Sequence, residues 1–219
     1  MIPAINPELK RLLPTLALGC VYATVQVEQY STALWQEIDQ HLSRLGTAHK
    51  PEAIGSLPQI AAMRVAYKAL GKDPSRYRGS AEALLRRVLS GKGLYQVNTV
   101  VDTNNLVSLE SLLPAGSYDL SRVVGPIELR IGAPGESYQG IGKDQINIEN
   151  LPVFADANGP FGSPTSDSER AMIRPESTEI LMVIFSFAGK DGLDAATSRA
   201  ADLLRRYAQA ERVEVKLVA

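Results

Sequence analysis

The chain of 219 residues has 45% hydrophobic residues and a formal net charge of −1, which is typical of a globular protein with one large core or two small ones. Its longest apolar run, around Ile180, has about half of the ~18 residues that cross a bilayer, which argues against a membrane-spanning helix. The amino terminus lacks the order of charged and apolar residues found in a signal peptide, so we expect a cytoplasmic protein without membrane contact.

Cysteine and histidine are scarce in this chain. The single cysteine, Cys20, excludes an intramolecular disulfide and a thiolate metal site. The two histidines, His41 and His49, are spaced for neither a zinc pair nor a catalytic triad. The glycine-containing segment Arg130–Gly142 lacks the lysine and serine of a phosphate loop. We therefore expect no metal and no cofactor.

Residues 1–79 are predicted to form an N-terminal part that contains helices and a strand. Helical spacing of apolar residues, capping side chains and glycine stops define its helices, and β-branched apolar residues define its strand. The predicted elements are a strand over Pro14–Val27, a helix from Ser31 or Thr32 to Gly46, and a helix that opens at Ser56 and Pro58 and ends at Gly71.

The second part of the chain alternates short β-rich runs with turns rich in Gly, Pro, Asn and Ser, which favours antiparallel strands. The runs are "SYDL", "IELRIG", "LPVFAD", "RAMI" and "TEILMVIFSF". A helix from Ser80 to Gly91 and a strand over Leu94–Val101 precede them, and a helix capped by Asp191 and a strand over Arg212–Val218 follow. We therefore predict a single α+β domain over residues 1–219, with a mainly antiparallel β core flanked by helices.

The segment Arg64–Lys92 is strongly basic. It carries eight Lys and Arg residues against two acidic residues, a balance of +6 that leaves the remainder of the chain at −7. Tyr67, Tyr77 and Tyr95 interleave with these bases, a composition that suits contact with phosphates and stacking on nucleotides. Helices with solvated basic faces would have the same composition. The candidate nucleic-acid-binding residues are Lys72, Arg76, Arg78, Arg86, Arg87 and Lys92.

Two polar segments are candidates for a site. In "VVDTNNLVSLESLLP", Asp102, Thr103 or Asn104 is expected to cap a helix, and the remaining polar side chains would lie beside free amides at its positive end. The turn-rich segment Asp156–Met172 has glycines that can aim backbone amides at a developing oxyanion, although a solvated hairpin loop would look similar. The candidate substrate-binding residues in these segments are Asp102, Asn105, Ser163, Asp167, Glu169 and Arg170.

An ordered series of motifs resembles the B3/B4 domain of the phenylalanyl-tRNA synthetase β subunit, the region that edits misacylated tRNA. The series is "SAEALLRRV", "VNTVVDTNNLVSLESLLPAGSYDL", "GPIELRIGAPGE", "LPVFADANG" and "SDSERAMIRPESTEILMVIF". The resemblance is clearest over residues 80–187. It implies a B3/B4-like fold that binds tRNA or hydrolyses a wrong aminoacyl ester. Nothing resembles an adenylate-forming core, so we expect no tRNA ligase activity and a similarity to free-standing B3/B4 proteins.

The resemblance carries over to single residues unevenly. Asn105 matches the family asparagine that lines the amino-acid pocket, and Asp102 matches the acidic residue just before it. Gly116, which the resemblance adds to the candidate substrate-binding residues, stands where the family commonly has a histidine. The late strand "ILMVIF" lacks the glutamate that recognises the hydroxyl of tyrosine. An unpaired phenol costs about 1–3 kcal/mol, so tyrosyl-tRNA is not the expected substrate.

Three functional hypotheses follow. The first is a tRNA-binding, editing-type domain that hydrolyses misacylated aminoacyl-tRNA in trans, with a bound water as the nucleophile. The second is a non-catalytic module that binds an amino acid or another small molecule. The third is a protein that interacts with a synthetase or with another protein. The expected partners are accordingly tRNA and an amino acid or aminoacyl ester.

Overall fold

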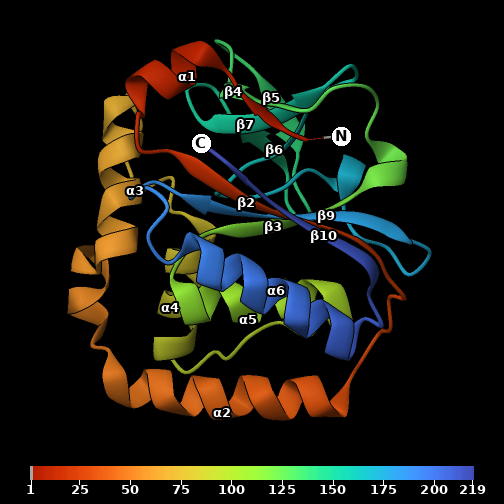
Figure 1. The fold of residues 1–219 in the computed structure, drawn as a ribbon. Coiled ribbons are helices and arrows are strands. Elements are labelled where there is room, and N and C mark those ends of the chain that lie inside the picture. The colour runs from red at the N-terminus through yellow and green to blue at the C-terminus, as the bar shows by residue number, and fades with distance from the viewer. Residues whose placement is uncertain (1) are drawn as a thin grey trace.

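The computed structural model describes residues 2–219 and has two layers of β-structure with most of the helical residues on one side (Figure 1). A four-stranded antiparallel sheet in the order β10-β2-β9-β3 lies in the middle of the molecule. A second four-stranded sheet, β1-β4-β7-β8, and the hairpin β5-β6 lie on one side of it, and α5, α6, α4 and α2 lie on the other. The α+β class with mainly antiparallel strands is therefore confirmed.

Some helices begin at residues whose chemistry favours a helix start. Ser31 caps α2 with its side chain, and proline occupies the first turn of α1 and of α3. The helices are α1 (Pro7–Leu12), α2 (Thr32–Ala48), α3 (Pro58–Ala69), α4 (Ser80–Leu89), α5 (Thr99–Ser111) and α6 (Leu193–Tyr207). None of the helices among residues 2–219 is long and apolar enough to cross a membrane.

The strands are mostly short, and β2 and β9, two of the longest, pair in the central sheet. The central sheet consists of β2 (Ala17–Thr24), β3 (Ala115–Asp119), β9 (Glu179–Ser186) and β10 (Glu211–Val218). The second sheet and the hairpin consist of β1 (Ala4–Ile5), β4 (Glu128–Ile131), β5 (Ser137–Gln139), β6 (Gln145–Asn147), β7 (Pro152–Asp156) and β8 (Gly159–Gly162).

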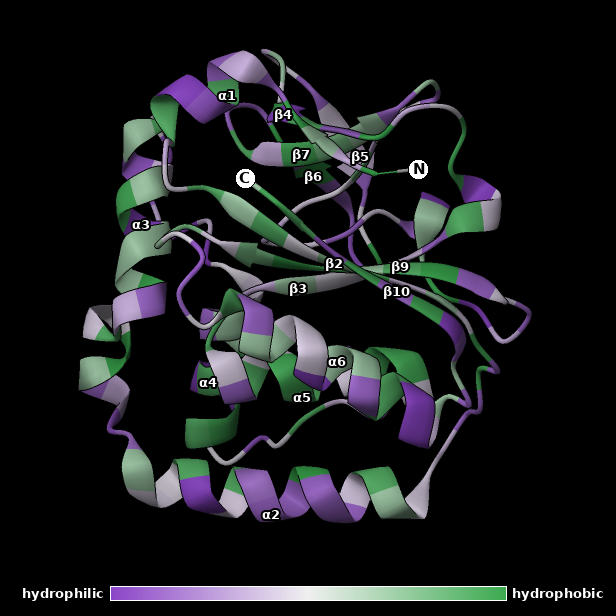
Figure 2. Ribbon diagram, in the orientation of Figure 1, coloured by the Kyte–Doolittle hydropathy of each residue, from purple (hydrophilic) through white to green (hydrophobic). Residues whose placement is uncertain are grey.

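Strand β9 separates two hydrophobic cores. Because side chains alternate along a strand, Leu181, Val183 and Phe185 face the core between the two sheets. The intervening residues Met182 and Ile184 face α5 and α6. Figure 2 shows the apolar colouring concentrated on the central strands, whereas α2 carries mainly polar residues. A third, smaller cluster, which includes Leu85 and Leu109, joins α4 and α5.

Some of the predicted boundaries are wrong. Leu94–Val97 lie in a loop rather than a strand, and Asn98 caps α5 by accepting a hydrogen bond from Val101 N at 2.9 Å. The helix therefore begins several residues before Asp102, the start of the polar cluster that the sequence predicts as its cap. The first predicted helix continues past Gly46 to Ala48.

Two further sequence signals indicate the wrong element or position. The first two residues of the run "RAMI" end a short 3-10 turn, Glu169–Ala171, and Met172 and Ile173 follow in irregular backbone. The Ser168 side chain caps the turn by accepting a hydrogen bond from Arg170 N. Gly192 rather than Asp191 stands at the N-cap of α6. In both cases a polar residue lies close to the element that forms, but its presence does not determine the backbone geometry there.

Candidate functional site

Three of the site residues predicted from the sequence, Gly116, Ser163 and Asp167, lie together around the Asp167 carboxylate. Asp167 lies in the loop after β8, and its Oδ1 accepts hydrogen bonds from the Tyr118 hydroxyl (2.9 Å) and the Ser163 backbone N–H (3.1 Å). Gly116 lies beside it on β3, so that a Cβ added there would be 3.1 Å from Asp167 Oδ2. We call Gly116, Tyr118, Ser163 and Asp167 the carboxylate corner.

The loop that carries Asp167 is held by hydroxyl groups. The Ser163 Oγ accepts from the backbone N–H groups of Thr165 (3.3 Å) and Ser166 (3.1 Å), and it donates to Ser166 O at 2.8 Å. Tyr67 hydrogen-bonds Thr165 Oγ1 at 2.8 Å, and the Tyr138 hydroxyl donates to Ser166 O. These bonds fix the direction of the Asp167 side chain, and they also occupy the Ser163 hydroxyl inside the chain.

Asp167 has the properties of an acid–base group. Burial raises its pKa from 3.8 to about 7, although the Tyr118 and Ser163 hydrogen bonds and the Lys143 charge act in the opposite direction. Part of its surface stays accessible to solvent. Its Oδ2 accepts no hydrogen bond from residues 2–219, because both donors bind Oδ1. Near neutral pH, Asp167 can therefore exchange a proton with a ligand or a water.

Tyr118 occupies the space that a side chain at position 116 would need. A Cβ at Gly116 would lie 2.5 Å from the Tyr118 hydroxyl, and one at Gly162 would lie 2.4 Å from the same ring. The ring itself is buried edge-on against Phe154 and Phe161. Glycine at position 116 and tyrosine at position 118 are thus coupled, so the histidine that the resemblance places at position 116 cannot be accommodated beside this tyrosine.

Asp102 lies apart from this corner and holds α5 in place. Its Oδ2 accepts from the Trp35 indole N–H at 2.8 Å and its Oδ1 from Val97 N at 3.0 Å, so both oxygens are occupied. Burial raises its pKa despite these hydrogen bonds. Its contacts are those of a residue that joins α5 to α2 and to the preceding loop.

Asn104, which is absent from the candidates chosen from the sequence, is the asparagine of α5 that contacts β3. Its Nδ2 donates to Ala115 O at 3.3 Å, and its Oδ1 accepts from the Ser117 hydroxyl at 3.2 Å. Asn105 is half-buried and has no side-chain hydrogen bond to the described part of the chain. Neighbouring residues on a helix point about 100° apart, so the choice between the two needed the position of β3.

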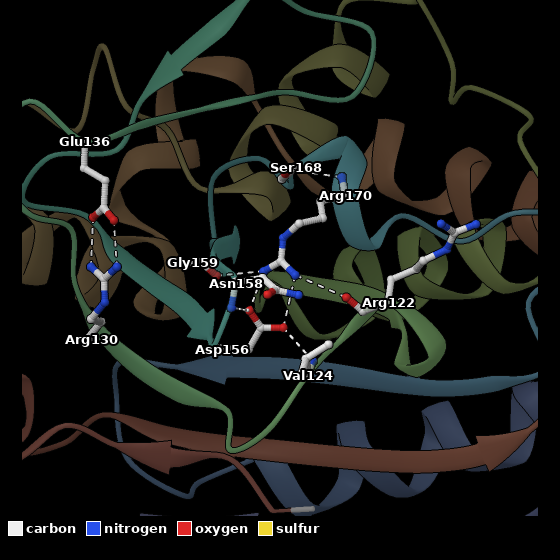
Figure 3. A network of polar contacts seen from close by, with 9 residues as sticks. All are labelled: Arg122, Val124, Arg130, Glu136, Asp156, Asn158, Gly159, Ser168 and Arg170. Atoms are coloured by element: carbon white, nitrogen blue, oxygen red, sulfur yellow. Dashed lines mark hydrogen bonds and ion pairs between the residues drawn. The ribbon is translucent and has the colours of Figure 1, made fainter.

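Arg170 acts as a clamp within the chain. Figure 3 shows its guanidinium directed at the Asp156 carboxylate, with distances of 2.8 and 3.0 Å, and at the carbonyls of Gly159 (2.7 Å) and Arg122 (3.2 Å). These bonds join the β7–β8 turn to the segment before β4 and leave few donors for a ligand. The neighbouring Glu169 contributes its backbone carbonyl, which accepts from Arg174 at 3.0 Å.

Several bases of the predicted tRNA-binding segment have partners within the chain. Glu82, which is 2% exposed, forms ion pairs with Arg64 (3.0 Å) and Arg86 (2.8 Å). The guanidinium of Arg87 lies 3.7 Å from the centre of the Tyr95 ring, and it donates to the Tyr95 hydroxyl at 2.9 Å. These contacts lower the number of bases that are free to meet phosphates.

Arg76, Arg78 and Lys92 remain exposed. Lys72 lies 4.3 Å and Arg76 lies 5.7 Å from the centre of the Tyr77 ring. Tyr67, in contrast, is 1% exposed, so the expectation that it stacks on nucleotides is wrong.

The segment between α3 and α4 is tied to the carboxylate corner. Ser80 N donates to Pro164 O at 2.8 Å, and the Lys72 ammonium reaches Asn147 on β6 at 3.3 Å. The exposed bases on this segment therefore lie next to the loop that carries Asp167. Among residues 2–219, no group of three or more His, Cys, Asp and Glu side chains is arranged to hold a metal ion.

Comparison with known proteins shows that the chain is similar to one protein family. A family model described as the B3/4 domain matches residues 62–209, more than half of the chain. The β subunit of phenylalanine–tRNA ligase from Aquifex aeolicus is 29% identical over 138 residues, which cover 55% of this chain and 18% of that protein. The corresponding subunit from Thermobifida fusca is 27% identical over 169 residues, which cover 74% of this chain and 20% of that protein.

A solved structure is also similar. It is the crystal structure of an N-terminal fragment of the phenylalanyl-tRNA synthetase β subunit from Pyrococcus horikoshii, with a TM-score of 0.49 and 10% identity. The match covers 98% of this chain and 49% of that one. The chain spans about a fifth of the length of the Aquifex and Thermobifida relatives.

A substitution tests the coupling between Gly116 and Tyr118. Gly116→Ala is expected to lower the free energy of unfolding by about 1–3 kcal/mol, because its Cβ would overlap the Tyr118 hydroxyl. Tyr118→Phe in the same chain removes that hydroxyl and should recover part of the loss, as urea denaturation would measure. An alanine at Gly46, where a Cβ would meet nothing within 4 Å, is the matched control. Equal effects of the two alanines would contradict the coupling.

The raised pKa of Asp167 predicts a pH dependence of stability. The pKa in the folded chain, about 7, exceeds the ordinary value of 3.8. The stability contributed by the protonated group is therefore fully present below pH 3.8 and is lost as the pH rises through about 7. Asp167→Asn should remove this loss, which we expect to be on the order of 1–2 kcal/mol given its partial exposure.

Urea denaturation between pH 4 and pH 8 measures this difference, and carboxyl 13C NMR reads the titration midpoint directly. Asp144→Asn, an exposed aspartate on the turn between β5 and β6, should leave the profile unchanged. A midpoint of Asp167 near its ordinary value would refute the assignment.

Proposed function

Because the chain belongs to the B3/4 domain family, we propose that it binds the aminoacyl end of a tRNA and hydrolyses misacylated esters in trans. The family relation makes it a domain of the kind associated with tRNA synthetases. As part of the same proposal, residues 1–219 act as one unit in the cytoplasm and have no ligase activity of their own. The observation that carries the proposal is the Oδ2 of Asp167 in the carboxylate corner, which accepts no hydrogen bond from residues 2–219.

Asp167 is suited to activate a water. An aminoacyl ester needs only a positioned nucleophile and a modest base, because its leaving group is a sugar hydroxyl. In the proposed step, Asp167 Oδ2 takes a proton from water while the water oxygen bonds to the ester carbonyl carbon. The bond from that carbon to the tRNA oxygen then breaks, and the proton passes to the leaving hydroxyl. A base with a pKa near 7 can both accept the proton from water and return it to the leaving group at neutral pH.

The exposed bases support the tRNA part of the proposal. Arg76, Arg78 and Lys92 can meet phosphates, and the Ser80–Pro164 hydrogen bond connects the segment of Arg76 and Arg78 to the loop of Asp167. A tRNA backbone that lies along this segment would carry its terminus toward the carboxylate corner. Arg86 and Arg87 contribute less in this proposal, because Glu82 and Tyr95 occupy them.

A second candidate is non-catalytic recognition of an amino acid. The Tyr118 hydroxyl fills the place of the family histidine, so the corner is narrower than the resemblance implies. An ionised Asp167 could then accept the α-ammonium group of an amino acid in a charge-assisted hydrogen bond. Tight binding of a free amino acid, without tRNA affinity and without ester hydrolysis, would favour this candidate.

A deacylation assay tests the catalytic proposal. Against a panel of misacylated tRNAs, the protein should accelerate hydrolysis of at least one ester, and the rate should rise as the pH passes through about 7, where Asp167 loses its proton. Asp167→Asn should lower the rate by about 10²–10⁴-fold, the usual contribution of a general base. Asp144→Asn is the matched control. No acceleration over buffer for any member of the panel would exclude hydrolysis.

Salt dependence tests the tRNA surface. Replacing Arg78 or Lys92 by Gln should weaken tRNA binding and reduce the slope of log K against log salt by about 0.7–0.9 for each phosphate that the variant no longer neutralises. Arg86→Gln should have a smaller effect on this slope, because Arg86 is paired with Glu82. Filter binding or fluorescence anisotropy at several salt concentrations measures the slope. Identical slopes for the wild type and the Arg78 and Lys92 variants would remove this segment from the proposed tRNA surface.

A further inference from the structure

A cleft apart from the carboxylate corner lies between the loop after β2, the beginning of α5 and residues 172–175. Its volume is about 440 Å³, within the range of small-molecule sites. Its wall is largely apolar and consists of Val27, Val97, Met172, Ile173 and Pro175. Its polar lining residues are Gln29, Asn98 and Arg174, and none of the described residues that line it is acidic.

Arg174 supplies a positive charge without an acidic partner. Its guanidinium donates to the carbonyls of Glu169 (3.0 Å) and Met172 (3.4 Å), and no carboxylate among residues 2–219 forms an ion pair with it. Its backbone N–H donates to the Ser177 hydroxyl at 2.9 Å, which in turn donates to Asp119 at 2.6 Å. The arginine is therefore held in position while part of its hydrogen-bonding capacity stays unused.

Asn98 supplies a second donor at the same cleft. The residue is only 7% exposed, and its Oδ1 is fixed by the N-cap hydrogen bond from Val101 N at 2.9 Å. Its Nδ2, on the opposite side of the amide group, donates to no residue of the described chain. A nearly buried amide without a partner leaves hydrogen-bonding capacity that a ligand in the cleft can use.

We propose that this cleft binds a small organic carboxylate with an apolar body and without an ammonium group. The carboxylate accepts hydrogen bonds from the Arg174 guanidinium and the Asn98 amide, and the apolar body packs on the Val97 and Ile173 side of the cleft. An α-ammonium group would find no acidic partner in the lining and would be repelled by Arg174. The site therefore discriminates against free amino acids, in contrast to the carboxylate corner, and it does not depend on the proposed deacylation.

Isothermal titration calorimetry with chosen probes tests the ligand class. The expected ligands are 3-phenylpropionate and 4-methylpentanoate, each of which should bind saturably. Their α-amino counterparts, phenylalanine and leucine, and the neutral 3-phenylpropionamide should bind about tenfold or more weakly at this cleft. Absence of saturable binding by both carboxylates, or equal binding of the amide, would overturn the proposal.

Variants locate the binding. Arg174→Met keeps the apolar stem and should weaken carboxylate binding by about tenfold or more. Asn98→Ser keeps the helix cap while removing the amide donor, and should weaken binding by a few fold. Asn98→Asp also keeps a capping oxygen but places a negative charge at the cleft, and should abolish binding.

Arg205→Gln, which removes an exposed charge on α6, is the control and should bind like the wild type. Circular dichroism establishes that each variant is folded. If Arg174→Met fails to fold, the comparison of the acid with its amide on the wild-type protein still decides the proposal. Unchanged carboxylate affinity in folded Arg174→Met and Asn98→Asp would refute it.

Discussion

The register of strand β9 governs the arrangement of both cores. The strand is hydrogen-bonded to β2 on one side and to β3 on the other, and all but its first residue are buried. Because its side chains alternate between two cores, its register decides which residues of its neighbours face the second sheet and which face the helices. A shift by one residue would exchange the two sets and disrupt both cores.

The carboxylate corner follows from that register. Pairing of Gly116 with Val183 and of Tyr118 with Leu181 places Gly116 and Tyr118 on the face toward the second sheet. Ser117, between them, points toward α5, where it meets Asn104. The loop after β8 then brings Asp167 over the same face, and burial beside Tyr118 raises its pKa. The candidate acid–base group thus arises from packing between two sheets.

The two candidate sites differ in the charge they present. The carboxylate corner has an acidic oxygen without a hydrogen-bond donor among residues 2–219, and it lies beside the exposed bases between α3 and α4. The cleft at the beginning of α5 has a cation and an amide donor and is otherwise largely apolar. Helix α5 begins at the cleft, with Asn98 as its N-cap, and its Asn104 binds β3 on the face opposite to Gly116 and Tyr118. Its many buried polar residues are consistent with a helix that positions side chains on more than one side.

The fold class, some helix starts and the family could be predicted from the sequence, because these depend on local signals and on the order of motifs along the chain. Ser31 and Pro58 mark helix starts through their own chemistry. The order of the quoted motifs indicated the family over residues 80–187, and the family model extends the match to residues 62–209.

The burial and the hydrogen-bond partners of individual side chains, in contrast, depend on tertiary contacts. Asn98 and Asp102 are both of residue types that cap helices, but the sequence pattern predicts a strand at Asn98. Hydrogen bonds from Trp35 and Val97 hold Asp102 in the interior. Tyr118 resembles an ordinary strand residue until its hydroxyl is found beside Asp167. From the sequence, Arg170 is a candidate for binding a ligand, whereas in the structure it forms an ion pair with Asp156. Hydrogen-bond partners and burial join residues that are distant along the chain, so no local pattern could specify them.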